Sequence, residues 1–306
     1  MQPRPGDGTA VPATDVLDSV AIASSDLPCP QALVSGPECV DPGLRFDPSV
    51  PHSARVYGYW LGGKDHYPAD REVAEEVIRR RPQVVAGARA NRAFLTRAVR
   101  YLAAECGVRQ FLDIGTGLPT PNCTHQVAQA IAPASRVVYV DNDPLVLVHA
   151  RALLTSGPQG SCDYVEADLC DPAAVLAGAA QTLDFTQPVA VLMLAVLHFL
   201  AGANDPGRVV AALDRRLAPG SFVAISHLTS DFAPGPVTAG VEAYNALVPT
   251  PLVPRSHAQV SALFGALPLV PPGVVPITEW RAATASPFPH AADLYAGVAR
   301  KPEGRI

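Results

Sequence analysis

Three short segments bring acidic side chains to the ends of apolar runs, where they could hold a polar ligand. The segments are 113–117 (DIGTG), 141–143 (DND) and 167–169 (ADL). A carboxylate beside a glycine-containing turn attracts an ammonium group and repels a pyrophosphate. A second carboxylate at this kind of site can accept hydrogen bonds from both hydroxyls of a ribose, and a third can hold an exocyclic amine.

The first segment, Asp113 to Gly117, gives the strongest local signal. Gly115 and Gly117 would let the backbone turn tightly and approach a ligand, and Thr116 lies between them. The nicotinamide dinucleotide fingerprint GxGxxG needs glycine at position 120, which is Thr120. A simple turn between a strand and a helix is the alternative interpretation of this segment taken alone.

The other two segments add more ambiguous acids. Asp141 lies 24 positions after Gly117, the spacing expected of a ribose-binding acid after one helix. Asp143 precedes Pro144, which predicts a helix cap instead. Asp168 could hold the exocyclic amine of an adenine with Leu169 packed on its ring. A helix N-cap is the alternative interpretation of Asp168.

The elements that position these acids alternate along the chain. The sequence predicts five strands at 110–114, 136–141, 163–167, within 188–199 and at 221–227, and helices at 122–132, 144–154, 172–179 and 206–217. Apolar strands that alternate with helices indicate a parallel sheet covered on both faces. The acids would then meet at the carboxyl edge of the sheet, where such folds bind ligands.

The chain ends depart from this alternation. Two helices are expected before the first strand, at 69–81 and 85–105, with the arginines at 79–81 as a solvated helix end. After the fifth strand we expect helices at 237–247 and 256–267, then two strands at 269–280 and 294–300 with no helix between them. Such neighbours pair antiparallel. The predicted fold is α/β, doubly wound, with a mostly parallel seven-stranded sheet and one late antiparallel strand.

A resemblance covers about residues 48–301. The order DIGTG, YVDND and EADL looks like a Rossmann-like class I S-adenosylmethionine-dependent methyltransferase. More closely, the chain resembles the S-adenosyl methyltransferase family, formerly a domain of unknown function. The segments that carry this likeness are 53–71, 88–102, 110–120, 136–154, 195–199, 217–227 and 295–301.

The resemblance implies S-adenosyl-L-methionine as cofactor and a methyl acceptor that it does not identify. Asp113, Gly115, Thr116 and Gly117 would line the methionine and ribose part, and Asp141 would hold the ribose. The adenine would lie between Asn142 and Asp168 beside Leu169, and the backbone at Ala195 would cover the sulfonium end. Pro119 stands where a third glycine is common, and it suits the first turn of the next helix.

Segment 57–67 (YGYWLGGKDHY) mixes aromatic residues, paired glycines and charges, which is poor helix or strand material. We expect part of an N-terminal helical lid here, with a loop that closes over the cofactor. Tyr57 would then bind the cofactor, and Lys64 or Asp65 would touch cofactor or acceptor as catalytic candidates. A plain surface loop is the alternative.

His198 follows the fourth strand, where it could act as a general base on an acceptor hydroxyl or amine. His227 is a second candidate, and both could instead be structural. Arg89 and Arg92 could bind an acceptor carboxylate or phosphate, or pair with nearby acids. Since methyl transfer is often limited by positioning, a base is not required.

Composition sets the remaining expectations. Net charge is −5 with a pI of about 5.9, which argues against nucleic acid or anionic membrane as partner. Lys64 and Lys301 are the sole lysines, which indicates a GC-rich genome, and the six cysteines show no metal-ligand spacing. We expect a cytoplasmic protein with a Pro/Gly-rich tail at 1–51, a lid at 52–107, a core at 108–301 and a tail at 302–306.

The hypothesis is therefore a methyltransferase acting on a small molecule, with no metal. A non-catalytic S-adenosylmethionine-binding module or sensor is the first alternative. An NAD(P)-dependent oxidoreductase is the second, disfavoured by Asp113 and Thr120.

Overall fold

The computed structural model describes residues 47–153, 155–284 and 292–303. The predicted tail at 1–51 lies almost wholly outside these ranges. The strands are β1 (Gln110–Ile114), β2 (Arg136–Asp141), β3 (Ser161–Glu166), β4 (Ala190–Leu194), β5 (Phe222–Leu228), β6 (Val275–Pro276) and β7 (Leu294–Arg300). The helices are α1 (Ser53–Trp60), α2 (Pro68–Arg80), α3 (Val84–Ala104), α4 (Thr124–Ile131), α5 (Pro144–Leu153), α6 (Pro172–Ala179), α7 (Pro206–Asp214), α8 (Pro234–Leu247) and α9 (His257–Ala262), with a 3-10 turn, η1, at Leu197–Phe199.

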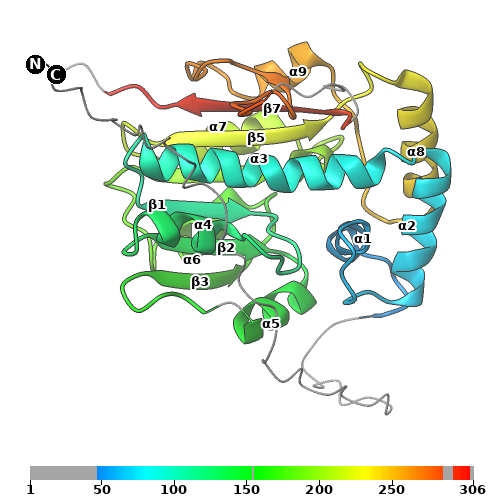
Figure 1. Cartoon of the computed structure of the whole chain (residues 1–306), viewed down its shortest axis with the longest axis horizontal. Helices are drawn as coiled ribbons and strands as arrows, with labels where there is room; N and C mark the ends of the chain where they lie inside the picture. Colours follow the sequence, from blue (N-terminus) through cyan, green and yellow to red (C-terminus); the bar gives the residue numbers. More distant parts are fainter. Residues whose placement is uncertain (1–46, 154, 285–291, 304–306) are drawn as a thin grey trace, which may run out of the picture. The chain divides into compact units, whose positions relative to one another are not determined.

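The seven strands form one sheet in the order β3-β2-β1-β4-β5-β7-β6 (Figure 1). Strands β1 to β5 are parallel, and β7 runs antiparallel to both β5 and β6. This confirms the predicted fold class. The register pairs Ile114 with Val140 and Asp141 with Glu166, so the ends of β1, β2 and β3 lie at one edge.

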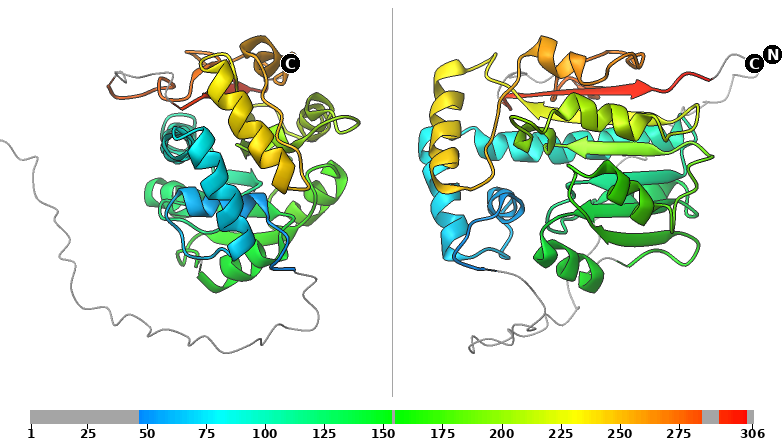
Figure 2. Two further views of the ribbon diagram at one scale, coloured as in Figure 1. Left: turned by 90° about the vertical axis from the view of Figure 1, so that its right-hand side faces the viewer. Right: turned by 180° about the vertical axis from the view of Figure 1, so that it is seen from behind.

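Alternating side chains along each strand face two separate cores. Phe111 and Val137 pack with Phe94 and Leu102 of α3, which crosses one face of the sheet (Figure 1). Leu112 packs on the other face with residues of α6, α7 and α9, seen from behind in Figure 2. The predicted doubly wound arrangement follows from this division.

A third core joins α1, α2 and α8 at the carboxyl end of the sheet (Figures 1 and 2). We call these three helices the cap. The core that they share with the start of α3 consists of Val56, Val73, Ala74, Val77, Val84, Tyr244 and Val248. The first part of segment 57–67 is therefore helical, contrary to prediction, because burial of α1 against α2 outweighs the weak helix propensity of Tyr, Trp and Gly.

Two further expectations are wrong. The long strand at 269–280 shrinks to β6 and one isolated bridge between Leu269 and Ala299, because Pro271, Pro272 and Pro276 lack the N–H that a ladder needs. Pro119 does not open the next helix either, since α4 begins at Thr124.

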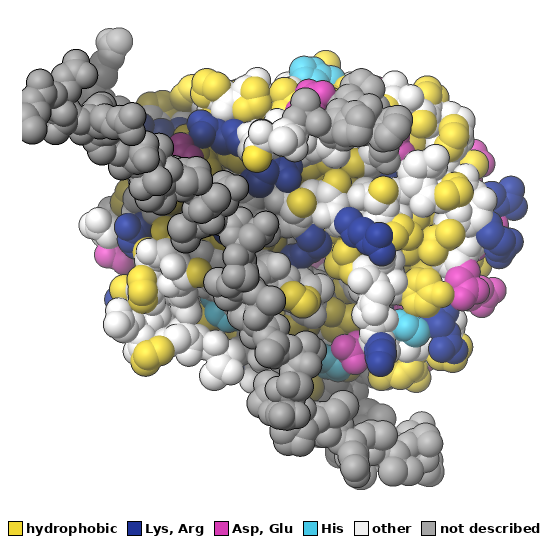
Figure 3. Space-filling view, in the orientation of Figure 1, with side chains coloured by type: hydrophobic (Ala, Val, Ile, Leu, Met, Phe, Trp, Pro, Cys, Tyr) yellow, Lys and Arg dark blue, Asp and Glu magenta, His cyan; other side chains and the backbone are white. Residues whose placement is uncertain are grey.

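Basic and acidic side chains intersperse on the outer surface where α2 lies (Figure 3). Arg79 and Arg80 are exposed there and pair with Glu76, as expected of a solvated helix end. No helix in the described ranges has the length and apolar character that a bilayer span requires.

Candidate functional site

A cavity of about 450 Å³ lies between the carboxyl edge of the sheet and the cap. Small-molecule sites commonly have volumes of about 300–1,000 Å³. Every residue predicted to bind the cofactor lines it, namely Tyr57, Asp113, Gly115, Thr116, Gly117, Asp141, Asn142, Asp168, Leu169 and Ala195. His198 also lines it, together with Trp60, Arg81 and Tyr244 from the cap, Asn91 from α3 and Phe199 from η1.

The turn after β1 needs glycine at two positions for different reasons. Gly115 has φ +72° and Gly117 has φ +65°, both in the left-handed region. A Cβ on Gly115 would lie 2.4 Å from Cγ2 of Val196, whereas a Cβ on Gly117 would meet nothing within 4 Å. Gly115 therefore allows the β1 turn to pack against the β4 turn, and Gly117 leaves open space in the cavity wall.

Asp113 at the end of β1 is buried, with 5% of its surface exposed. Its Oδ2 accepts a hydrogen bond of 2.6 Å from the Thr124 hydroxyl at the start of α4. Burial raises the pKa of Asp113 to about 6, although the Thr124 bond and the Arg92 charge oppose this shift. A cationic ligand group beside Asp113 would favour its ionised form.

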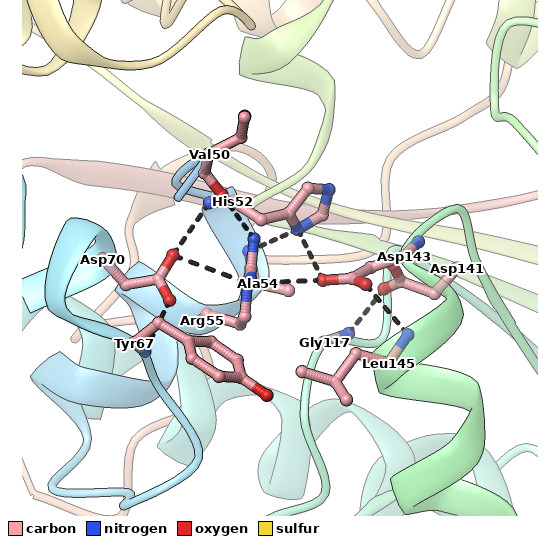
Figure 4. Close-up of polar contacts among 10 residues, drawn as sticks. All are labelled: Val50, His52, Ala54, Arg55, Tyr67, Asp70, Gly117, Asp141, Asp143 and Leu145. Carbon is pink, nitrogen blue, oxygen red and sulfur yellow. Dashed lines mark hydrogen bonds and ion pairs between the residues drawn. The ribbon is translucent and has the colours of Figure 1, made fainter. Parts of the chain in front are cut away.

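Asp141 at the end of β2 is held by two backbone amides. Its Oδ2 accepts from the Gly117 N–H at 2.9 Å, and its Oδ1 accepts from the Asp143 N–H at 3.0 Å (Figure 4). Burial raises its pKa, while these two bonds lower it. Each carboxylate oxygen has two lone pairs, so a fixed Asp141 can still accept from ligand hydroxyls.

Asp143 has two roles, of which the sequence indicated one. Its Oδ1 accepts from the Leu145 N–H at 2.9 Å, which confirms the predicted helix cap. Its Oδ2 lies 3.1 Å from Nδ1 of His52 and 3.7 Å from Nε of Arg55 (Figure 4). Burial alone would raise the pKa of Asp143, but His52, the Leu145 amide and Arg55 together lower it.

The same two basic residues meet a second buried acid, Asp70 at the start of α2. Asp70 accepts from the backbone N–H of His52 at 2.9 Å and of Tyr67 at 2.8 Å, and it lies 3.4 Å from Nε of Arg55. We call His52, Arg55, Asp70 and Asp143 the α1 latch. It ties α1 to α2 on one side and to the loop after β2 on the other (Figure 4).

One atom of the latch has two competing bonds. Nδ1 of His52 accepts from the Ala54 N–H at 3.3 Å, and the same nitrogen faces Asp143. It can accept the first bond only without a proton and donate the second only with one. Sequence reasoning missed this group, because nothing near His52 reveals that Asp143 would lie opposite it.

A hydrogen-bonded chain connects α1 to the turn after β4. Tyr57 donates to the Ala88 carbonyl at 3.0 Å and accepts from Nδ2 of Asn91 at 3.0 Å. Oδ1 of Asn91 accepts from the Ser226 hydroxyl at 2.6 Å, and that hydroxyl accepts from the Ala195 N–H at 2.9 Å. Ala195 has φ +55°, so a strained backbone position is held beside the cavity.

The two histidine candidates differ. His198 lines the cavity, accepts from the Leu228 N–H through Nδ1 at 3.4 Å, and has a pKa that burial lowers well below the usual value. His227 is fully buried and does not line the cavity. It donates through Nδ1 to the Leu228 carbonyl at 2.7 Å, and its Nε2 accepts from Arg255 at 2.8 Å. Its geometry favours the structural interpretation.

The charged residues of the predicted loop lie elsewhere. Lys64 and Asp65 are exposed and do not line the cavity, and Asp65 lies 3.6 Å from Nδ1 of His149. This geometry lends no support to a catalytic role for either. Asn142 and Asp168 are exposed but reach the cavity, and Oδ1 of Asp168 accepts from the Cys170 N–H at 2.7 Å.

The arginines of this region also lie in different surroundings. Arg89 is exposed, whereas Arg92 lines the cavity and donates to the Asn122 carbonyl at 3.3 Å. Arg81 was expected in solvent, but it is buried and donates through Nε to Asp293 at 3.0 Å. That prediction is wrong because the partner arrives from the loop before β7, 212 positions along the chain.

Comparisons with known proteins agree with this geometry. A family model described as S-adenosyl methyltransferase matches residues 41–302. A DUF574 family protein from Streptomyces avermitilis MA-4680 is 43% identical, with a TM-score of 0.79 over 84% of this chain and 99% of that one. A putative methyltransferase from Thermobifida fusca YX is 38% identical, with a TM-score of 0.77 over 85% and 98%. No protein of curated function matches.

Proposed function

Because this chain belongs to the S-adenosyl methyltransferase family, whose cofactor is S-adenosylmethionine, we propose that it methylates a small-molecule acceptor bound beside that cofactor. The observation that carries the proposal is the cavity wall formed by the ends of β1 to β4. It combines the glycine turn and the three acids that the sequence predicted with a strained backbone position at Ala195. The oxidoreductase alternative has no support from the family.

The residues present fit the cofactor. Gly117 leaves space open where any side chain would intrude, and the Asp141 carboxylate is oriented by two amides while keeping lone pairs for a ribose diol. Asp113 offers a carboxylate to the ammonium group of the methionine part. Asn142, Asp168 and Leu169 would border the adenine, and Thr116 lies in the β1 turn between the two glycines.

When bound, S-adenosylmethionine supplies a methyl group on positively charged sulfur, which an acceptor lone pair attacks in line as the sulfur–carbon bond breaks. The protein's contribution is then mainly to orient the two reactants and exclude water. The chain from Tyr57 through Asn91 and Ser226 to Ala195 would fix α1 and the β4 turn relative to each other. The α1 latch would hold the cap against the loop after β2, next to Asp141.

His198 takes a different role from the predicted general base in this proposal. Its Nδ1 accepts the Leu228 N–H, which leaves the proton of the neutral ring on Nε2. A buried ring in this state orients an acceptor oxygen by donating a hydrogen bond to it. Such a role suits an acceptor that reaches the cavity already ionised.

The test uses S-adenosylmethionine tritiated in its methyl group. The full chain is incubated with it and with the small-molecule fraction of a bacterial lysate, and labelled products are separated by chromatography. We expect label in a discrete small molecule, lost in Asp141→Ala. Binding of S-adenosylhomocysteine without any labelled product would contradict the proposal and favour the non-catalytic sensor.

A further inference from the structure

The cap side of the cavity differs in charge from the strand edge. The acids that line the cavity lie at strand ends: Asp113 and Asp141 are among the last residues of β1 and β2, and Asp168 comes just after β3. Of the two arginines in the lining, Arg92 lies on α3, and its charge opposes the rise that burial causes in the pKa of Asp113. Arg81 is therefore the charged residue that the cap contributes to the cavity, and it has no cavity-lining acid beside it.

Burial and two polar contacts fix the position of the Arg81 guanidinium. Arg81 is 5% exposed, its Nε donates to Asp293 at 3.0 Å, and its Nη2 lies 3.4 Å from the Ala292 carbonyl oxygen. Asp293 does not line the cavity, although its neighbours Ala292 and Leu294 do. Asp293 thus binds the guanidinium from outside the cavity.

Two glycines make room for this side chain. A Cβ on Gly240 of α8 would lie 3.1 Å from Cβ of Arg81, and a Cβ on Gly87 of α3 would lie 2.8 Å from the Ala292 carbonyl oxygen. Both helices therefore pass closer to the Arg81 pocket than a larger residue would allow. The close approach keeps the guanidinium at the cavity wall and away from bulk water.

Two further side chains of the cavity lining, His198 and Tyr244, can donate hydrogen bonds. Tyr244 lies about one helical turn from Gly240, the α8 residue that approaches Arg81. His198 offers Nε2–H, because its Nδ1 accepts from the Leu228 N–H. Tyr244 lines the same side, and its buried hydroxyl makes no hydrogen bond of ordinary geometry; its contact with Ser53 falls short of one.

Much of the remaining wall on this side is apolar. It is formed by Trp60, Val77, Val84, Phe199, Val241 and Leu252, with Ser53 of α1 and Asn91 of α3 as polar members. Asp293 already pairs with Arg81, so the preference for an anion comes from the remaining guanidinium N–H groups and the two further donors, which act where water is largely excluded. An amine in the same place would meet hydrogen-bond donors instead of acceptors.

We propose that the methyl acceptor is an apolar organic acid that binds as its carboxylate, with the carboxylate against Arg81 on the cap side of the cavity. This inference rests on the proposed function and adds the chemical class of the acceptor. Tyr244 and His198 are the further donors to that carboxylate. The apolar body of the acid packs against the cap helices.

Three probes of nearly the same shape test the charge preference: phenylacetate, phenylacetamide and phenethylamine. Each is titrated by calorimetry into the full chain saturated with S-adenosylhomocysteine. We expect phenylacetate to bind at least about tenfold more tightly than the amide, which corresponds to about 1.4 kcal/mol, and the amine to bind most weakly. Equal binding of the three, or no binding of phenylacetate, overturns the proposal.

Variants assign the preference to Arg81. Arg81→Met alone would leave Asp293 buried without its partner, so Arg81→Met is combined with Asp293→Asn. This double variant should lose the preference for phenylacetate and keep its affinity for S-adenosylhomocysteine. Arg79→Met, at the exposed end of the same helix, is the matched control and should bind all three probes as the wild type does. A preference that persists in the double variant contradicts the assignment.

Tyr244→Phe gives an independent test that does not threaten the fold, because the hydroxyl has no well-formed bond to lose. It should weaken phenylacetate binding severalfold with no change in S-adenosylhomocysteine affinity. Unchanged phenylacetate binding would remove Tyr244 from the proposed site. If the wild type fails to bind S-adenosylhomocysteine at all, the proposed function fails, and this result is distinct from a missing charge preference.

Discussion

The two walls of the cavity are built in different ways. At the strand edge, acids and glycines from short segments at the ends of successive strands are fixed by backbone amides, as Asp141 is by Gly117 and Asp143. On the cap side, the polar groups come from distant parts of the chain, and Arg81 meets Asp293 across 212 positions. The first wall follows from local sequence and suits a cofactor shared by a family. The second depends on tertiary packing and can differ between members that take different acceptors.

The largest effect is expected where the two turns of the strand edge touch. Gly115→Ala would force a Cβ to 2.4 Å from Val196 at a φ of +72°. Strain and overpacking together should lower the free energy of unfolding by about 2–5 kcal/mol and abolish cofactor binding. Denaturant unfolding and calorimetry measure both.

Gly117→Ala is the matched control, since its Cβ meets nothing within 4 Å. Backbone strain should lower its free energy of unfolding by only about 1–2 kcal/mol. The added Cβ should still obstruct cofactor binding. Equal stability losses in the two variants would show that the Val196 contact is unimportant.

At Asp113, the ionised carboxylate should favour S-adenosylmethionine binding but lower the free energy of unfolding. The pKa of Asp113 is raised to about 6, so the folded state keeps a proton that the unfolded chain has lost, and stability falls as pH rises from about 4 to about 6. Asp113→Asn should therefore gain about 2–3 kcal/mol of unfolding free energy at pH 7 and bind S-adenosylmethionine more weakly.

The pH dependence of binding sharpens this prediction. Wild-type affinity for S-adenosylmethionine should rise as pH increases through about 6, because ionised Asp113 attracts the ammonium group. Calorimetry across this range should give a flatter profile for Asp113→Asn. An identical profile in the variant would show that Asp113 does not contact the cationic part of the cofactor.

The α1 latch connects the two walls, and we expect a smaller effect there. Asp143→Asn keeps a good helix cap but removes the charge facing His52 and Arg55, which should cost about 1–3 kcal/mol at pH 7. Because the pKa of Asp143 is lowered by folding, its contribution is present above the ordinary aspartate pKa and disappears as pH falls through the folded value.

Asp171→Asn is the control for this latch variant, since Asp171 caps α6 through the Ala174 N–H. It should change stability by a few tenths of a kcal/mol, roughly the range of ordinary surface substitutions. If thermal melts show the same loss for both variants, Asp143 acts as a cap alone and the latch adds nothing.

The smallest effect is expected from the exposed loop. Lys64→Ala and Asp65→Ala should change the unfolding free energy by less than about 0.5 kcal/mol and leave cofactor binding unaltered, because neither side chain reaches the cavity. A large loss of methyl transfer in either variant would show that this loop closes on the reactants during the reaction.

The difference between the two cavity walls also explains which features could be predicted from the sequence. The positions of most strands along the chain and the wall from Asp113 to Asp168 were predictable because hydrophobic periodicity and glycine turns are local signals. Helix α1 was missed because its residues have weak helix propensity and are stabilised by α2 and α8. The solvated Arg81 and the long strand at 269–280 were wrong because a distant partner and the prolines decided those positions. His52 gave no signal, since its partner Asp143 lies in another element.

The most direct test of the central claim is a set of thermal melts of the full chain and of Asp141→Ala. Each is measured alone and with S-adenosylhomocysteine, S-adenosylmethionine or NADH. A ligand at 100 times its dissociation constant adds about 2.7 kcal/mol, or roughly 5–10 °C for a domain of this size. We expect this rise for the wild type with the two sulfur ligands alone, and a much smaller rise for Asp141→Ala. A rise with NADH, or equal rises in both proteins, would contradict a cofactor site at the strand edge.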